Sequence, residues 1–172
     1  MSKKSIENVI IETLTGDVQK NALDFVNYLR TNDATIHDSD NYFWSTTYKD
    51  KDLCIITIGI EDKETTSFEI FFNVLPNCIT SPDAIYDNSD KYVSFPVDKQ
   101  KIVWESVRPC DCIDYDCKSK TDNRMIIFGK EFNNLCYCFL GMSDPDAETV
   151  DCMKRIIDAR IFEILNKSNT SS

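Results

Sequence analysis

Residues 42–74, YFWSTTYKDKDLCIITIGIEDKETTSFEIFFNV, decide the fold because they hold three apolar segments in close succession. In 42–49, 53–61 and 67–74 the larger apolar or aromatic side chains recur at every second position. This is the period of a β-strand. The middle segment is apolar on both faces, so we expect it to be a central strand. The polar residues Glu61–Thr66 are expected to form a hairpin turn between the second and third strands.

Two helices are expected before these strands. Apolar residues recur at helical spacing over 5–14 and again over 18–31. Gly16 is expected to end the first helix, and Asp17 to cap the second one.

The segment after the three strands is expected to contain a further helix and a hairpin. Asp98 is expected to cap this helix, and Pro109 to end it. A cysteine-containing loop then occupies residues 110–123. The hairpin is expected over 124–132 and 134–141, turning at the adjacent asparagines between them.

The last helix is expected over 144–166, with Pro145 at its first position. Asp144 and Asp146 form a pair of carboxylates, but their place at a helix start favours capping and interaction with the helix dipole.

The expected element order is α-α-β-β-β-α-β-β-α. Consecutive strands with short turns favour an α+β fold, in which an antiparallel sheet of about five strands has helices packed on one face. A parallel sheet would need a helix after each strand. We expect one domain over 1–172, with N-terminal helices over 5–31, the sheet with its inserted helix and cysteine loop over 42–141, and the C-terminal helix over 144–166.

The net charge of −10 argues against a nucleic acid or an anionic membrane as a partner, because both require surfaces rich in lysine and arginine. The first eight residues include charges but no apolar segment, so we expect no secretory signal. No apolar run approaches the ~18 residues that span a bilayer. We therefore expect a cytoplasmic protein, in which clustered cysteines stay reduced and more often bind metal than form disulfides.

Five of the eight cysteines gather in one region, in the pattern C-x-C-x4-C followed by C-x-C. They are Cys110, Cys112, Cys117, Cys136 and Cys138. Three aspartates lie among the first three of them, so thiolates and carboxylates together would form a negative pocket that a divalent cation neutralises. The same charge would repel phosphates, which argues against a zinc module that binds nucleic acid.

Cys136 and Cys138 are expected on one face of a strand, with Cα atoms roughly 6.5–7 Å apart. That spacing is at or beyond the upper limit for an unstrained disulfide. A zinc ion could accept both thiolates, since Zn–S bonds of about 2.3 Å bridge the gap. We therefore expect zinc in preference to an iron–sulfur cluster, with four of the five cysteines as ligands.

Two other interpretations of the cysteines stay open. The five could form a redox-active thiol set, or they could be small apolar side chains in the core. The second interpretation suits Cys54, Cys78 and Cys152, whereas the loop cysteines lie in an Asp-rich segment with little to bury.

Residues 124–138, RMIIFGKEFNNLCYC, resemble a segment of a family of small uncharacterised bacterial cytosolic proteins. In that family an FGKEF-x-N-x-C-x-C stretch follows a clustered-cysteine loop and precedes a helix similar to 144–160. The loop of the family typically has C-x2-C spacing, whereas this chain has C-x-C-x4-C. The resemblance therefore implies a cysteine motif, leaves the ligand set open and supplies no activity.

Two further candidates have simpler interpretations. His37, the only histidine, lies in Thr35–Asp40, which has the composition of a surface turn, so a histidine-dependent triad is not expected. Six aromatic residues of the strands could line a ligand pocket, but a place in the sheet core is the favoured interpretation. They are Tyr42, Trp44, Tyr48, Phe68, Phe71 and Phe72.

The sequence therefore predicts a binding or interaction module with a structural zinc site, whose partner is an unidentified protein or small molecule. Four thiolates leave no open coordination position, so the pattern does not predict catalysis by the metal. One alternative is a thiol redox or metal-sensing protein, in which the fifth cysteine is exposed and reactive. Another is a small-molecule-binding domain that uses the aromatic face of the sheet. The oligomeric state is left open.

Overall fold

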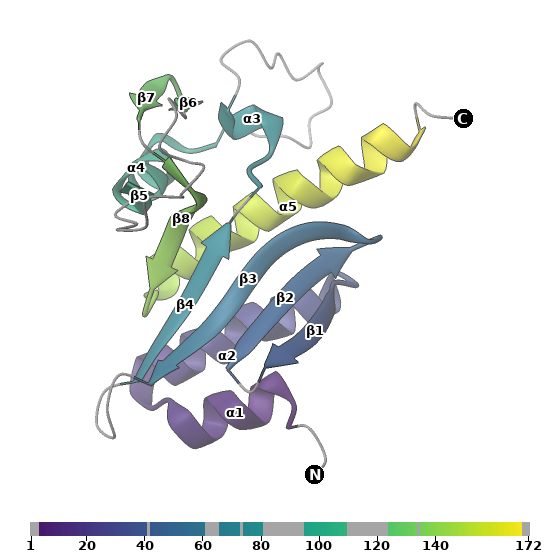
Figure 1. Cartoon of the computed structure of the whole chain (residues 1–172), viewed down its shortest axis with the longest axis vertical. Helices are drawn as coiled ribbons and strands as arrows, with labels where there is room; N and C mark the ends of the chain where they lie inside the picture. The colour runs from purple at the N-terminus through teal and green to yellow at the C-terminus, as the bar shows by residue number, and fades with distance from the viewer. Residues whose placement is uncertain are drawn as a thin grey trace, which may run out of the picture.

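The computed structural model describes residues 4–40, 42–60, 66–72, 74–80, 95–109, 124–133 and 135–169. The predicted α+β architecture is confirmed, with an antiparallel sheet of six strands in place of the expected five or so (Figure 1). The strand order is β1-β2-β3-β4-β8-β5. The strands are β1 (Thr35–Asp40), β2 (Phe43–Tyr48), β3 (Lys51–Ile60), β4 (Thr66–Phe72), β8 (Leu135–Ser143) and β5 (Val107–Pro109).

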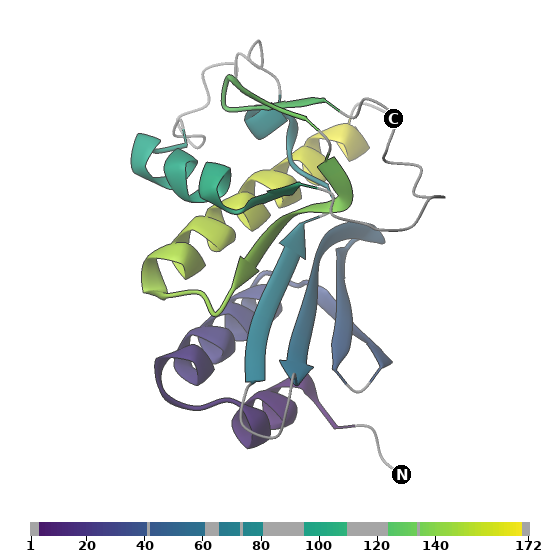
Figure 2. The ribbon, with the colours of Figure 1, turned by 60° about the vertical axis from the view of Figure 1, so that its left-hand side comes forward.

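The two long helices lie on one face of this sheet. Figures 1 and 2 show α2 and α5 side by side on one face of the sheet, with α1 beside α2. α4 packs against α5 near the β5 edge. The helices are α1 (Ile6–Thr13), α2 (Gly16–Thr31), α3 (Asn77–Thr80), α4 (Val97–Glu105) and α5 (Ala147–Asn169).

The core fills the space between the sheet and these helices. Alternate residues of β3 and β4, such as Ile56 and Phe68, point toward the helices and are buried. They meet apolar side chains of α2 and α5, among them Phe25 and Ile157, in one continuous cluster. Removing this apolar surface from water is the main stabilising contribution to the fold.

The opposite side of the sheet, called the open face below, is more polar. It consists of two cross-strand rows, Ser45-Ile55-Phe71-Gly141 and Phe43-Thr57-Glu69-Ser143. No described helix covers these rows (Figure 2). One buried and one solvated face is the usual arrangement of an antiparallel sheet, and it explains the alternation in the sequence.

The two N-terminal helices agree with the predicted positions, but their caps differ in part. Ser5 caps α1, since its hydroxyl accepts a hydrogen bond from the backbone N–H of Asn8 at 3.3 Å. The expected cap of α2, Asp17, lies instead in its first turn, and the N-cap is Thr15. Gly16 was expected to end the first helix, but α1 already ends at Thr13 and Gly16 is the first residue of α2. It occupies the left-handed region at φ +61°, which a glycine tolerates.

The prediction of a surface turn at Thr35–Asp40 was wrong, because these residues form the edge strand β1. His37 pairs with Ser45 of β2, and its Nε2 lies 2.9 Å from the hydroxyl of Thr47. Among the described residues β1 pairs with β2 alone, and the side chains of 35–39 are exposed or half-buried, so the segment has no apolar alternation. Charged residues on such an edge disfavour pairing with other chains.

The helix expected from Asp98 to Pro109 is shorter than predicted. α4 begins after Pro96, without a side-chain cap, and ends at Glu105. The next residues lead into β5, which is an edge strand. Its proline has no backbone N–H to pair, so an edge position suits it. The four-residue helix α3 was not predicted.

The hairpin predicted at Asn133-Asn134 was also wrong. Met125–Ile127 (β6) pairs with Lys130–Phe132 (β7) in a separate two-stranded sheet. Its turn is Phe128-Gly129, both at positive φ, which a two-residue hairpin favours and glycine tolerates. β8 leaves this hairpin and enters the main sheet between β4 and β5.

The two aspartates before α5 have different roles. Asp146 caps the helix, since its Oδ1 accepts a hydrogen bond from the N–H of Thr149 at 2.8 Å. Asp144 instead contacts β4: its Oδ1 accepts from the N–H of Phe68, and its own N–H donates to the Phe68 carbonyl, both at 2.8 Å. The helix therefore begins at Ala147, two residues later than the expected first position at Pro145.

We expect Asp146→Ala to lower the free energy of unfolding by about 1 kcal/mol at pH 7. The hydrogen bond from the Thr149 backbone holds the pKa of Asp146 below its usual value. A lowered folded-state pKa gives stability that is present above the unfolded-state pKa and is lost as the pH falls through the folded one. The difference between variant and wild type in urea denaturation should therefore shrink below about pH 4. A constant difference down to pH 2 would contradict this role.

Lys99 joins α4 to α5, although lysine is seldom buried. Its Nζ donates to the Glu148 carbonyl at 3.3 Å and lies 3.4 Å from a carboxylate oxygen of Asp151. The long apolar part of the side chain packs between the helices while the amine meets these oxygens. This contact fixes α4, and thereby the start of β5, relative to the sheet.

Within the described part of the chain, no helix has both the length and the apolar character needed to cross a membrane.

Candidate metal centre

The start of the cysteine loop lies beside β8. Pro109, the last residue of β5, pairs with Leu135, the first residue of β8. In the sequence, Cys110 directly follows Pro109 and Cys136 directly follows Leu135. The fold therefore brings together two chain segments that lead into the two groups of cysteines.

Of the five predicted ligands, only the backbone of two lies in the described residues. Cys136 and Cys138 are both in β8, as expected for a C-x-C pair on a strand. Cys110, Cys112 and Cys117 lie outside the described residues. The β5–β8 pairing shifts register between Leu140 and Leu135 of β8, the stretch that contains these two cysteines.

The far end of the loop leads into the β6–β7 hairpin, which is anchored on α3 and α4. The indole Nε1 of Trp104 donates to the Ile127 carbonyl at 2.7 Å. The N–H of Phe128 donates to the Ile79 carbonyl at 2.9 Å, and its ring packs on Phe95 with centroids 4.9 Å apart. Both ends of residues 110–123 are therefore connected to fixed elements.

Two cysteines outside the cluster, Cys54 and Cys152, are buried free thiols, as the core interpretation predicted. Burial raises the pKa of each of them to about 12. Cys54 also lies 3.1 Å from the hydroxyl of Thr46. Among the described side chains no three or more of His, Cys, Asp and Glu are placed to hold a metal ion. Neither buried thiol is therefore part of a described metal site.

We expect Cys54 and Cys152 to resist alkylation by iodoacetamide at pH 8 in the native protein. The thiolate is the reactive form, and a pKa of about 12 leaves almost none of it at pH 8; both side chains are also buried away from the reagent. Mass spectrometry should find both residues unlabelled before denaturation and labelled after it. Rapid native labelling of either residue would contradict their burial.

A group of residues on the open face fastens β5 to the sheet, and we call it the Arg108 clamp. It consists of Arg108, Glu69, Phe71, Gly141 and Ser143. The Nη2 of Arg108 donates to the Ser143 hydroxyl at 2.5 Å and lies 3.6 Å from a carboxylate oxygen of Glu69. The Ser143 hydroxyl in turn donates to Glu69 at 2.8 Å. The guanidinium carbon lies 5.3 Å from the centroid of the Phe71 ring.

Gly141 allows this arrangement, because Arg108 reaches its partners across β8 at that residue. A Cβ at Gly141 would lie 2.8 Å from Nε of Arg108 and 2.9 Å from the Phe71 ring. The clamp was not predicted from the sequence. An isolated glycine within a strand pattern is the one signal of a close approach that the sequence contained.

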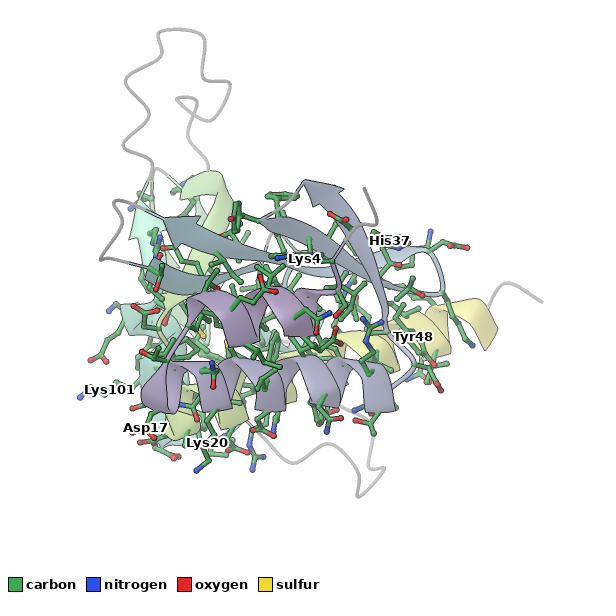
Figure 3. The ribbon with its side chains drawn as sticks, turned by 90° about the horizontal axis from the view of Figure 1, so that it is seen from below. Lys4, Asp17, Lys20, His37, Tyr48 and Lys101 are labelled. Carbon is green, nitrogen blue, oxygen red and sulfur yellow. The ribbon has the colours of Figure 1, made fainter. Side chains whose placement is uncertain are left out.

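The other candidates of the sequence analysis take structural roles. His37 lies at the β1 edge of the sheet (Figure 3), where its ring contacts the Thr47 hydroxyl. Three of the six strand aromatics, Trp44, Phe68 and Phe72, are buried in the core between sheet and helices. Only Phe71 of the β4 aromatics belongs to the open face.

Comparison of the chain with models of protein families, with curated proteins and with solved structures gives no match.

Proposed function

We propose that this protein is a binding or interaction module with a structural zinc ion held by four of the five clustered cysteines. The pairing of Pro109 with Leu135 is the observation that carries the proposal. Cys110 and Cys136 each follow one member of that pair in the sequence. The loop of 110–123 therefore starts beside the strand that contains Cys136 and Cys138.

The composition of the cluster suits zinc. Four thiolates at Zn–S distances of about 2.3 Å complete a tetrahedral site. Such a site has no open position for a substrate, so its role would be to fasten the loop to β8. The free energy of binding is then coupled to folding, because the ligands come from separate segments of the chain.

Having five thiols for four positions supports a second candidate, a thiol redox or metal-sensing protein whose spare cysteine is reactive. The aromatic-face alternative is weaker, because Trp44, Phe68 and Phe72 are buried in the core. For both remaining candidates we propose a cytoplasmic location, since a reducing compartment keeps cysteines as thiols.

Elemental analysis of the protein purified without chelator tests the proposal. We expect about one zinc per chain, bound by four thiolates. An iron–sulfur cluster would instead give visible colour together with iron and inorganic sulfide. Protein that contains no metal while all its cysteines are reduced would exclude the structural zinc site.

We also propose that the protein does not bind nucleic acid. With a net charge of −10, phosphate contact meets repulsion. A zinc ion with four thiolates still leaves a net negative charge at the site, so the cluster offers no positive anchor. A gel-shift assay with mixed DNA and RNA at moderate salt should show no retarded band. Sub-micromolar binding there would overturn the charge argument.

A further inference from the structure

We propose that α4 opens away from α5 as a local unit while the sheet and the long helices stay folded, and that the contacts of Lys99 with α5 control how often it opens. α4 packs against α5 at the edge of the molecule (Figures 1 and 2). Opening uncovers the face of α5 around Cys152, which is buried in the closed structure. The proposal is independent of any metal.

α4 is a short helix that depends on packing for its stability. It has nine residues and begins after Pro96 without a hydrogen bond from a capping side chain. Isolated helices shorter than about 12–15 residues are marginal in water, so contacts with the rest of the protein keep α4 helical. The buried side chains of α4 are those of Lys99 and Val103. One of the two buried residues that attach this helix is therefore a lysine.

The Lys99 contacts join the first turn of α4 to the beginning of α5. The Nζ atom of Lys99 donates to the Glu148 carbonyl at 3.3 Å and lies 3.5 Å from a carboxylate oxygen of the same residue. A carboxylate oxygen of Asp151 lies 3.4 Å from it. Lys99 is 9% exposed, and its buried ammonium is tolerated because these oxygens replace water. Since hydrogen bonds of charged groups are strong, losing them should favour the open state.

The C-terminal end of α4 remains attached when the helix opens. The carbonyl of Ser106, directly after α4, accepts a hydrogen bond from the N–H of Gly141 in β8 at 3.1 Å. The Arg108 clamp then connects β5 to β4 and β8. Opening therefore ends at Ser106, and the strands need not separate. It breaks the hydrogen bond from the Trp104 indole to the Ile127 carbonyl, so the closed state predominates.

Two buried thiols report on two different openings. Cys152 is fully buried, and its Sγ donates to the Lys99 carbonyl at 3.6 Å, so it becomes accessible when α4 opens. Cys54 lies in β3, where its backbone N–H donates to the Thr46 hydroxyl of β2 at 3.0 Å. A reagent reaches Cys54 when the central strands separate. Local opening at an edge costs less free energy than unfolding of the core, so Cys152 should react faster than Cys54.

The test measures slow alkylation of both thiols in the native full-length chain. A brief exposure to iodoacetamide leaves both unlabelled, whereas a prolonged one detects rare openings. Peptide mass spectrometry gives the rate for each thiol, and division by its rate in urea removes differences in intrinsic reactivity. In wild type we expect Cys152 to react at least about tenfold faster than Cys54. Equal normalised rates would mean that both are reached by global unfolding, and would overturn the proposal.

Lys99→Ala and Lys101→Ala separate the Lys99 contacts from the general effect of removing a lysine. Both residues are in α4, but Lys101 is exposed and pairs with Glu105 of the same helix. We expect Lys99→Ala to raise the rate at Cys152 about tenfold, as for the loss of a hydrogen bond to a charged group. Lys101→Ala should match wild type. An unchanged rate at Cys152 in Lys99→Ala would show that the Lys99 contacts do not control opening.

Tyr28→Phe tests whether the opening is local. It removes the hydrogen bond between Tyr28 of α2 and Asp158 of α5, which stays intact when α4 opens. This variant should raise the rate at Cys54, which depends on global unfolding, and leave the rate at Cys152 unchanged. An equal increase at both thiols would overturn the proposal.

Hydrogen exchange distinguishes opening of α4 from a hole that a shorter side chain leaves over Cys152. In Lys99→Ala the amides of residues 100–105 should exchange faster than in wild type, by the same factor as the alkylation of Cys152. Faster alkylation with unchanged exchange in α4 would mean that the reagent enters through a static hole, and would contradict the proposed opening.

Discussion

Replacing Cys136 and Cys138 together by serine is expected to lower the melting temperature by roughly 8–16 °C. The cluster would retain only three thiolates, so the fifth cysteine could not complete a set of four. A site saturated about a thousandfold above its dissociation constant stabilises the fold by roughly 4 kcal/mol. In a protein of this length each kcal/mol corresponds to about 2–4 °C. Calorimetry and zinc analysis of the purified variant measure both consequences.

The matched control is the double variant Cys54→Ala/Cys152→Ala. These two thiols are buried and lie outside the cluster. Each loses a small packed group, and Cys54 also loses its contact with Thr46, at a cost of about 1 kcal/mol each. Its zinc content should equal that of wild type. Equal losses of melting temperature in both double variants, with zinc unchanged in both, would show that Cys136 and Cys138 are not ligands.

We expect Phe68→Ala to lower the free energy of unfolding by about 3–5 kcal/mol, the usual cost of emptying a packed aromatic site. The Phe68 side chain is fully buried on β4, opposite Ile58 of β3, on the face that the helices cover. Loss of its ring removes contacts at the centre of the core. Urea denaturation followed by circular dichroism measures the change.

Phe43→Ala is the control for the opposite face of the sheet. Phe43 is on β2, belongs to the open face and is 38% exposed. Its truncation should cost less than about 1 kcal/mol, since little packed surface is lost. A cost as large as that of Phe68→Ala would mean that the open face is covered in solution, which would contradict the division of the sheet into a buried and a solvated face.

The central strands were predictable because burial on one face leaves a pattern of period two. β3 and β4 occur where the apolar side chains alternate, and Ile56, Ile58 and Phe68 are the buried members. The N-terminal helices were predictable because burial of one helix face leaves apolar residues at helical spacing. In each case the residues that point into the core repeat often enough for the period to identify the element.

The edge strands could not be predicted in this way. β1 has the sequence TIHDSD, and β5 is the tripeptide VRP. Each is defined by backbone pairing with one neighbour, which imposes no alternation on side chains that are mostly solvated. The hairpin was misplaced because two adjacent asparagines are a common turn signal, whereas the chain turns at Phe128-Gly129.

Only part of the candidate site followed from the sequence. The strand expected over 134–141 corresponds to β8, which contains Cys136 and Cys138. The Arg108 clamp joins residues of three strands, with Arg108 and Ser143 separated by 35 positions in the chain. Local sequence patterns do not predict such contacts, because the contacts depend on which strands are neighbours in the sheet. The insertion of β8 between β4 and β5 was the missing information.

X-ray absorption spectroscopy at the zinc edge tests most directly the claim that the clustered cysteines hold the metal. For protein purified without chelator, we expect four sulfur atoms at about 2.3 Å from zinc and no nitrogen or oxygen ligand. A first coordination sphere made of nitrogen and oxygen atoms at about 2.0–2.2 Å would contradict it.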